Sequence, residues 1–258
     1  MRRNKVPEVT ALFWVTKLLT TAMGETTSDY LVKSFDPYLV VGITFVVFVA
    51  ALALQFAVRR YIVWVYWLAV LMVAVFGTMV ADVMHVQFGI PYLVSATGFA
   101  VILAAVFALW YRSQRTLSVH SINSGTREFF YWCAVLATFA LGTAVGDLTA
   151  VTFGLGFLAS GIVFGVLFLL PGAAHRWWGM GAVAAFWTSY VLTRPFGASF
   201  ADWFARPEAL GGLGYGTGPV SLALFVAIVA CVAAQSVRRS PQPAQAGAGP
   251  VGVAAPDA

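Results

Sequence analysis

Eight apolar stretches divide this chain, and each is close to the length that crosses a bilayer. They span residues 9–29, 38–58, 61–82, 91–111, 129–150, 154–171, 178–200 and 217–236. A helix needs about 20 apolar residues to cross the hydrocarbon core of a membrane. Because 60% of the residues are hydrophobic and only 10% are charged, there is too little polar surface for a water-soluble globule. The sequence therefore predicts an all-α, polytopic membrane protein with eight transmembrane helices.

Lys and Arg are divided unequally between the two sets of connecting segments. Eleven lie near the chain ends and after the second, fourth and sixth stretches, whereas only Lys33 and Arg206 lie in the opposite set. Basic segments stay on the cytoplasmic side of a membrane. We therefore expect both termini in the cytoplasm and the protein in the cytoplasmic membrane. The same placement explains the net charge of +5 without a nucleic-acid partner.

A fourfold repeat organises the whole chain. An aromatic residue precedes a Trp, a Gly follows that Trp by ten residues, and an Asp follows it by fifteen. The repeated residues are Trp14, Trp67, Trp132 and Trp187, then Gly24, Gly77, Gly142 and Gly197, then Asp29, Asp82, Asp147 and Asp202. Because each copy falls in an odd-numbered stretch, each unit contains two spans and enters the membrane in the same direction. This predicts four parallel repeats around a pseudo-symmetry axis along the membrane normal.

The spacing of the repeats sets the expected organisation of the chain. A tail rich in Pro, Gly and Ala follows the last stretch and is expected to be disordered in the cytoplasm. The units are expected at 1–60, 61–115, 116–175 and 176–239, with the tail at 240–258.

The two spans of each unit differ in polarity. The first span carries the ionisable residues and most of the Thr, while the second is nearly all apolar. Polar groups inside a membrane face the protein interior or a wet cavity. We therefore expect four inner helices, covered against lipid by the other four.

These features resemble a known family. The opening KVPEVTALFWVTKLLTTAMGETTSD and the four tandem two-span units, each marked by Trp, are similar to a family of bacterial membrane proteins defined by a repeat of unknown function. The resemblance covers about residues 5–236. It implies the architecture of four two-span units and brings no activity with it.

A second oxygen-bearing position accompanies the repeated Asp. It lies eleven residues after the Trp and is occupied by Glu25, Thr78 and Thr143 in three units and by Ala198 in the fourth. At about 100° per residue, it shares a helix face with the Asp one turn later. Packing of the four units would place all these oxygens in one acidic layer near the outer ends of the spans. Acidic rings commonly select cations in membrane pathways.

Two basic residues, Lys17 and Arg194, fall within the spans of the first and fourth units. A closed ring would make these units neighbours and place both cations near the acidic layer. They could gate the acidic layer. Alternatively, they could form ion pairs that only hold the first and fourth units together. His85, one turn after Asp82, is a further candidate for a proton relay or a metal ligand.

The oxygen-rich layer predicts the ligand chemistry. Carboxylate and hydroxyl oxygens suit a hard cation such as Mg²⁺, Ca²⁺ or Mn²⁺, and the carboxylates suit protons equally well. No cofactor beyond such a cation or protons is expected. The predicted ligands are Glu25, Asp29, Asp82, Asp147 and Asp202, with Thr78 and Thr143 as additional oxygens. The repeated Trp and Gly are assigned to helix packing and the membrane interface.

The leading prediction is a transporter or channel for a small cation, either a divalent metal ion or a proton-coupled ion, in contact with the lipid bilayer. The alternative is a membrane-embedded binding or scaffold protein whose acids only pair with Lys17 and Arg194. An enzyme is least favoured, because the sequence shows no nucleophile–base pair, CxxC pair or nucleotide loop. The oligomeric state is left open.

Overall fold

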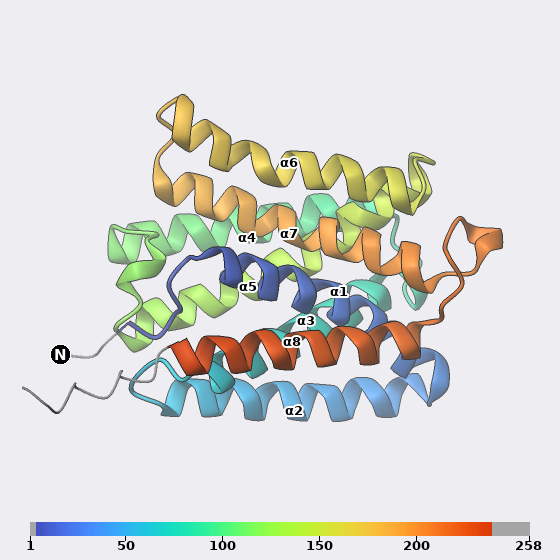
Figure 1. Ribbon diagram of the computed structural model, residues 1–258, viewed down its shortest axis with the longest axis horizontal. Helices are drawn as coiled ribbons and strands as arrows, with labels where there is room; N and C mark the ends of the chain where they lie inside the picture. The colour runs from blue at the N-terminus through green and yellow to red at the C-terminus, as the bar shows by residue number, and fades with distance from the viewer. Residues whose placement is uncertain (1–3, 239–258) are drawn as a thin grey trace, which may run out of the picture.

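The computed structural model describes residues 4–238, and this part of the chain is helical, without strands. Eight long helices lie side by side along the long axis of the molecule (Figure 1). They are α1 Ala11–Ser34, α2 Pro37–Ala57, α3 Val63–Val86, α4 Tyr92–Gln114, α5 Gly125–Asp147, α6 Phe157–Trp177, α7 Ala182–Ala205 and α8 Thr217–Arg238. The predicted tail at 240–258, and the basic residues Arg2, Arg3 and Arg239, lie outside the described residues.

Six of these helices, α2, α3, α4, α5, α6 and α8, are long and apolar enough to cross a membrane. The other two, α1 and α7, have the length but carry buried ionisable side chains, Lys17 and Glu25 in α1 and Arg194 and Asp202 in α7. The expected all-α membrane class is therefore confirmed. Six helices qualify as spans by their composition.

Short polar residues set where several helices begin. The side chain of Thr10 accepts a hydrogen bond from the backbone nitrogen of Phe13 at the start of α1. Asp36 caps α2 in the same way, and Pro37 occupies the first turn. Ser124 caps α5. Such caps satisfy backbone donors that have no partner inside the helix, and Pro is tolerated there because it lacks that donor.

The odd-numbered helices form a closed ring. Helix α1 contacts α3 and α7, and α5 contacts the same two helices from the opposite side. We call α1, α3, α5 and α7 the inner helices and α2, α4, α6 and α8 the outer helices. Across the apolar core of each outer helix only 17% to 28% of residues are buried, against 61% in α3 and 72% in α5. The outer helices therefore present their apolar side chains to the surroundings, as lipid-facing helices do.

Each outer helix packs most extensively on the inner helix that follows it in the chain. Helix α2 packs on α3, α4 on α5 and α6 on α7, and the last helix, α8, packs on the first, α1. The packing pairs are thus shifted by one helix from the pairs that the sequence repeat defines. Helix α8 closes the ring of pairs by covering α1.

The repeated glycines lie where neighbouring inner helices approach closely. A methyl group on Gly24 of α1 would lie 2.7 Å from the Cβ of Ala74 in α3, and one on Gly77 of α3 would lie 2.8 Å from the Cβ of Phe139 in α5. The other two contacts pair Gly142 of α5 with Arg194 of α7, and Gly197 of α7 with Thr21 of α1. One register position therefore links each inner helix to the next around the ring.

Each repeated tryptophan lies within the first eight residues of an inner helix. The inner helices begin at the end of the bundle where both described chain ends lie, which we call the terminal end (Figure 1). Trp67, Trp132 and Trp187 are buried in the main hydrophobic cluster. Trp14 is partly exposed and packs edge-on against Phe168 of α6. Three of the four tryptophans thus fill the interior of the bundle rather than facing outward.

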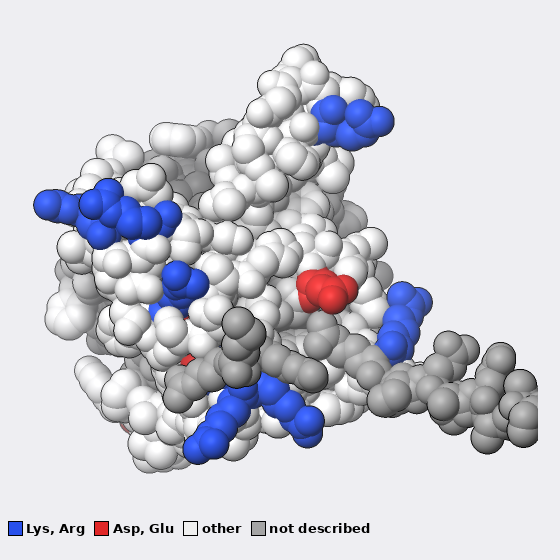
Figure 2. Space-filling view, turned by 90° about the vertical axis from the view of Figure 1, so that its left-hand side faces the viewer, with Lys and Arg blue, Asp and Glu red and all other residues white. Residues whose placement is uncertain are grey.

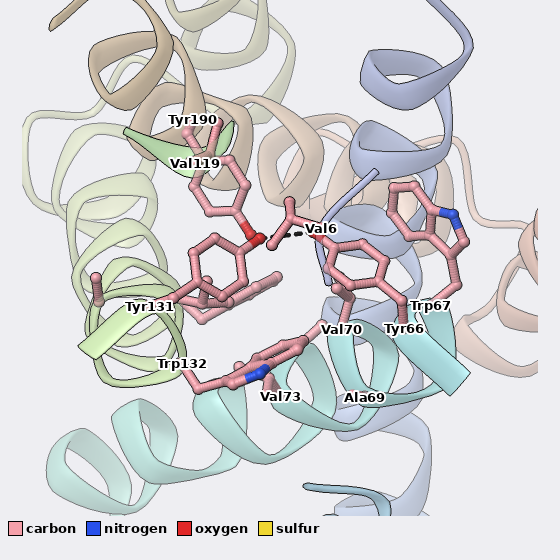
Figure 3. Close-up of a cluster of buried hydrophobic side chains, with 14 of the residues drawn as sticks. Val6, Tyr66, Trp67, Ala69, Val70, Val73, Val119, Tyr131, Trp132 and Tyr190 are labelled. Atoms are coloured by element: carbon pink, nitrogen blue, oxygen red, sulfur yellow. Dashed lines mark hydrogen bonds between the residues drawn. The ribbon is translucent and has the colours of Figure 1, made fainter. Parts of the chain in front are cut away.

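The segment before α1 folds back against this terminal end. Lys5 is 5% exposed, and its Nζ lies 2.5 Å from Oε2 of Glu128 and 3.1 Å from the carbonyl oxygen of Gln55. Its backbone nitrogen donates to the carbonyl oxygen of Ile122. Val6 is buried within the aromatic cluster (Figure 3). Lys5, which the charge pattern placed in a cytoplasmic segment, therefore forms a buried ion pair.

We expect the substitution Gly24→Ala to destabilise the protein, because the added methyl group would meet both the side chain and the backbone of Ala74. Overpacking of this kind costs about 1–3 kcal/mol. The matched control is Gly42→Ala in α2, where nothing lies within 4 Å. The control should be neutral or stabilising by up to about 1 kcal/mol, because Ala favours helix over Gly. Thermal unfolding in detergent measures both, and equal melting temperatures would contradict the close-packing role of Gly24.

Candidate functional site

An acidic cavity of about 590 Å³ lies among the last turns of the inner helices, at the end of the bundle opposite the terminal end. Three inner helices contribute acids to it, α1 with two and α3 and α5 with one each. Its charged lining residues are Glu25, Asp29, Asp82, Asp147, Lys33 and Arg206. Four of the five predicted ligands therefore line one space.

Arg206, directly after α7, bridges two of the acids. Its Nε donates to Oδ1 of Asp202 at 2.9 Å, and its Nη2 lies 3.1 Å from Oδ2 of Asp29. Burial alone would lower the pKa of Arg206, but the carboxylates of Asp202 and Asp29 raise that pKa above its ordinary value. Lys33 also contacts Asp29, with 2.6 Å between Nζ and Oδ2. Asp202, the fifth predicted ligand, is thus held beside the cavity by Arg206.

Asp82 and Asp147 have no basic partner among residues 4–238. The carboxylate of Asp82 accepts one hydrogen bond, from Oγ of Ser28 at 3.3 Å, and that of Asp147 accepts none from the described residues. Asp147 ends α5, where the chain continues as a π-helical turn, Leu148–Thr152. Such turns are frequent at functional sites. Two carboxylates without ion pairs therefore face the cavity.

The guanidinium of Arg194 fills the centre of the ring beneath this cavity. Its Nη2 donates to Oε2 of Glu25 at 2.6 Å and to the hydroxyls of Thr143, at 2.7 Å, and Thr78. Its Nη1 donates to the carbonyl oxygen of Thr21 at 3.0 Å. Arg194 is 1% exposed. One guanidinium from α7 thus binds oxygens from all three other inner helices.

The repeat explains how this arrangement arises. Glu25, Thr78 and Thr143 occupy one register position, and the equivalent position in α7 is Ala198. The fourth unit supplies a cation instead, from Arg194 one turn earlier. Gly142 of α5 makes room for it, because a methyl group there would overlap the Arg194 side chain. Three repeated oxygens thus surround a positive charge that belongs to the fourth repeat.

Lys17 lies deeper in the bundle and is 1% exposed. Its Nζ lies 3.8 Å from the ring centre of Phe139 and 4.3 Å from that of Tyr190. The amine makes no hydrogen bond or ion pair with any residue between 4 and 238. Contacts with aromatic faces stabilise a desolvated cation by about 2 kcal/mol. Arg194 therefore forms the predicted ion pair, with Glu25 as its partner. Lys17 has no acidic partner within the described chain.

Three tyrosine side chains from α3, α5 and α7 point toward one another in Figure 3, and the ring of one of them, Tyr190, contacts Lys17. The hydroxyl oxygens of Tyr66 and Tyr131 lie 2.6 Å apart. Tyr190, whose ring contacts Lys17, points its hydroxyl toward this pair in Figure 3. The Lys17 amine and the three tyrosine hydroxyls are thus the polar groups of an otherwise aromatic layer inside the ring.

The charge pattern placed two site residues, Arg206 and Lys33, only in outer segments. Each follows a repeated Asp by four residues, Arg206 after Asp202 and Lys33 after Asp29. Residues four apart lie on one helix face, where opposite charges pair. This spacing was the signal that would have placed both cations at the cavity.

No three His, Cys, Asp or Glu side chains among residues 4–238 are arranged to hold a metal ion. The acids instead surround a cavity, with two of them engaged by Arg206. The ring of His85 is also engaged, because its Nδ1 lies 2.9 Å from the carbonyl oxygen of Ile90 and its Nε2 lies 3.4 Å from Oγ of Ser95. The cavity is therefore lined by four carboxylates but has no preformed metal cage among the described residues.

The fold and the cavity define a polytopic helical membrane protein with a charged interior. The family model described as "Repeat of Unknown Function (DUF347)" matches residues 12–61, 65–116, 130–178 and 185–240. Each match begins one residue before an aromatic–Trp pair. The chain belongs to this family, as its sequence resemblance indicated. No curated protein and no solved structure matches it significantly.

We expect Glu25→Gln to destabilise the protein, because it leaves the buried guanidinium of Arg194 without its carboxylate. Removing one partner of a buried ion pair costs about 3–5 kcal/mol. Adding Arg194→Met to Glu25→Gln should restore part of this loss, since no unpaired charge then remains at the centre of the ring. The free energy of unfolding in mixed micelles measures the effect.

The control for this experiment is the exposed pair at the cavity rim. Lys33 is 54% exposed, and Asp29 keeps Arg206 as a partner without it. Lys33→Ala should therefore change the free energy of unfolding by less than about 1 kcal/mol. A Glu25→Gln variant as stable as Lys33→Ala would show that the central pair does not hold the ring together.

Proposed function

We propose that this protein is a transporter or channel for a small cation in the bacterial inner membrane. The observation that carries this proposal is the pair Asp82 and Asp147, which line the cavity without a basic partner among the described residues. The lining has four acids against two bases, and an excess of one sign of charge in a cleft concentrates the oppositely charged ion. Acidic rings are a common device for admitting cations to membrane pathways.

The proposed topology has eight spans, arranged as four parallel two-helix repeats around a pseudo-symmetry axis along the membrane normal. The closed ring of inner helices and the four equivalent glycine contacts support it. Helices α1 and α7 can join the six apolar spans because their charged groups face the interior of the ring. The cation pathway would follow this axis.

The proposed orientation places both termini in the cytoplasm and the acidic cavity on the outer side. Figure 2 shows the terminal end, where several groups of Lys and Arg are spread over the face and one acidic patch is visible. Basic residues favour the cytoplasmic side. A cation would then enter the cavity from outside the cell.

Arg194 would act as the gate in this scheme. Its guanidinium already occupies the oxygens of Glu25, Thr78 and Thr143, directly beneath the cavity. Passage therefore requires the guanidinium to release at least part of these hydrogen bonds. In this scheme the arrangement of Arg194 would represent the closed state of the pathway.

A scaffold role remains the second candidate, favoured by the ion pair between Arg194 and Glu25. It requires that the interior acids serve only to neutralise interior bases. Asp82 and Asp147 have no such base within residues 4–238, and Lys17 has no such acid. The transporter accounts for these unpaired groups, whereas the scaffold leaves them without a role.

We expect ion flux in proteoliposomes, measured separately for Na⁺, K⁺, Mg²⁺, Mn²⁺ and H⁺, to depend on Asp82 and Asp147. Asp82→Asn and Asp147→Asn should each reduce the flux of the transported ion by about tenfold, because each removes a negative charge that attracts cations. The matched control is Asp36→Asn, an exposed residue at the start of α2. Asn caps helices as well as Asp does, so this variant should keep the wild-type flux.

Unchanged flux in both cavity variants, with a melting temperature equal to that of the wild type, would contradict the proposed function. Absence of flux of every tested ion in the wild type would favour the scaffold role.

A further inference from the structure

We propose that the ion crossing the barrier between the acidic cavity and the terminal end is H⁺, and that the Lys17 amine carries it. This inference rests on the proposed function and names the transported ion. Four structural observations support it, concerning the central guanidinium, the surroundings of Lys17, the acids of the neighbouring helices and the tyrosine hydroxyls.

The first observation is the positive charge at the centre of the ring. A metal cation leaving the cavity would have to displace the guanidinium of Arg194 from Glu25, Thr78 and Thr143. It would then approach Lys17, a second basic side chain on the same path. Two basic side chains in series oppose a cation of fixed charge, which cannot shed that charge on the way.

The second observation is the shortage of ligands around Lys17. Its contacts are the faces of Phe139 and Tyr190. A hard metal cation needs about six oxygen ligands, or must keep its waters. This aromatic layer supplies rings and a few hydroxyls. A proton needs no such shell, because it moves from one titratable group to the next.

The third observation is that no acid among the described residues neutralises Lys17. Helix α7 faces it with Tyr190 and Arg194, and α5 faces it with Phe139. Helices α2 and α8 contain no Asp or Glu. On its own helix, Glu25 lies about 12 Å further along and is bonded to Arg194. A proton can therefore leave Lys17 and return without breaking an ion pair.

The remaining acids of the inner helices lie at the two ends of the bundle. Asp29, Asp82, Asp147 and Asp202 lie in or beside the cavity, and Glu128 is bonded to Lys5 at the terminal end. The Lys17 amine is thus the titratable base between the cavity acids and the tyrosines.

The fourth observation is the group of tyrosine hydroxyls on the far side of Lys17. A hydroxyl both donates and accepts a hydrogen bond, so it passes a proton on without a net change of charge. The Tyr66 and Tyr131 hydroxyls already contact each other at 2.6 Å, the Tyr190 hydroxyl points toward them in Figure 3, and the Lys17 amine lies over the Tyr190 ring. These hydroxyls offer H⁺ a route through the aromatic layer.

One cycle then moves one proton. The Lys17 ammonium releases H⁺ toward the tyrosine hydroxyls and becomes a neutral amine. The amine next accepts H⁺ from the cavity side, where Asp82 and Asp147 collect protons from solution. The side chain returns to its starting state, and one H⁺ has crossed without any oxidant or reductant.

The test uses the purified full-length protein in liposomes that enclose a pH-sensitive dye. The wild type should acidify the lumen when H⁺ is driven inward by a membrane potential. The rate should stay the same when external Na⁺ is replaced by N-methylglucamine, and the flux should reverse when the pH gradient is reversed. An H⁺ flux that disappears without Na⁺ would overturn the proposal, and this measurement needs no variant.

Variants of Lys17 separate the carrying of a proton from the mere presence of a positive charge. Lys17→Arg keeps the charge but does not release its proton. It should lower H⁺ flux by at least about tenfold, since a positioned acid–base group commonly contributes about 100-fold or more to proton transfer. Lys17→His keeps a titratable nitrogen and should retain part of the flux. The control is Arg112→Lys at the exposed end of α4, which should match the wild type.

A folded Lys17→Arg variant with wild-type H⁺ flux would overturn the role of Lys17. Flux of Na⁺, K⁺ or Mn²⁺ without H⁺ in the wild type would overturn the choice of ion and leave the proposed function standing. Absence of all flux would reject both.

Discussion

The buried ion pair between Arg194 and Glu25 is the interaction on which the rest of the ring depends. A lone charge in the middle of a helix is expensive at membrane depth and has to face a partner or water. Helix α1 contributes the carboxylate and α7 contributes the guanidinium, so each charge reduces the energetic cost of burying the other. Hydroxyls from α3 and α5 complete the set of hydrogen-bond acceptors, and the four inner helices therefore converge on one group.

The outer helices also hold the ring together, because their packing is shifted by one helix from the sequence repeat. Because each outer helix lies mainly on the inner helix of the next unit, every unit is attached to its neighbour by two contacts, one between inner helices and one through the outer helix. The last helix makes the same contact with the first. Lipid replaces water around such a bundle, so close contacts at small residues carry much of the association. The repeated glycines provide these contacts at one level of the ring.

The sequence predicted the features that depend on local periodicity, which are the helical membrane class, the polar inner helices and the shared register of the four Asp. It also placed Arg194 near Glu25. It did not predict the partner of Lys5, because Glu128 lies 123 residues away. Arg206 resembled an ordinary loop charge, and nothing local indicated that Lys17 would meet aromatic rings instead of an acid. These outcomes depend on which helices become neighbours, and hydrophobic patterning does not encode that choice.

The segment with Lys5 and Val6, which folds back against the terminal end, can dock only late during synthesis. Ile122 and Glu128, which hold Lys5, are made more than a hundred residues after it. The N-terminal segment must therefore wait outside the bundle until α5 has been inserted. A bulky protein fused directly before Lys5 would interfere with this last docking step, whereas one fused after α8 would leave it free.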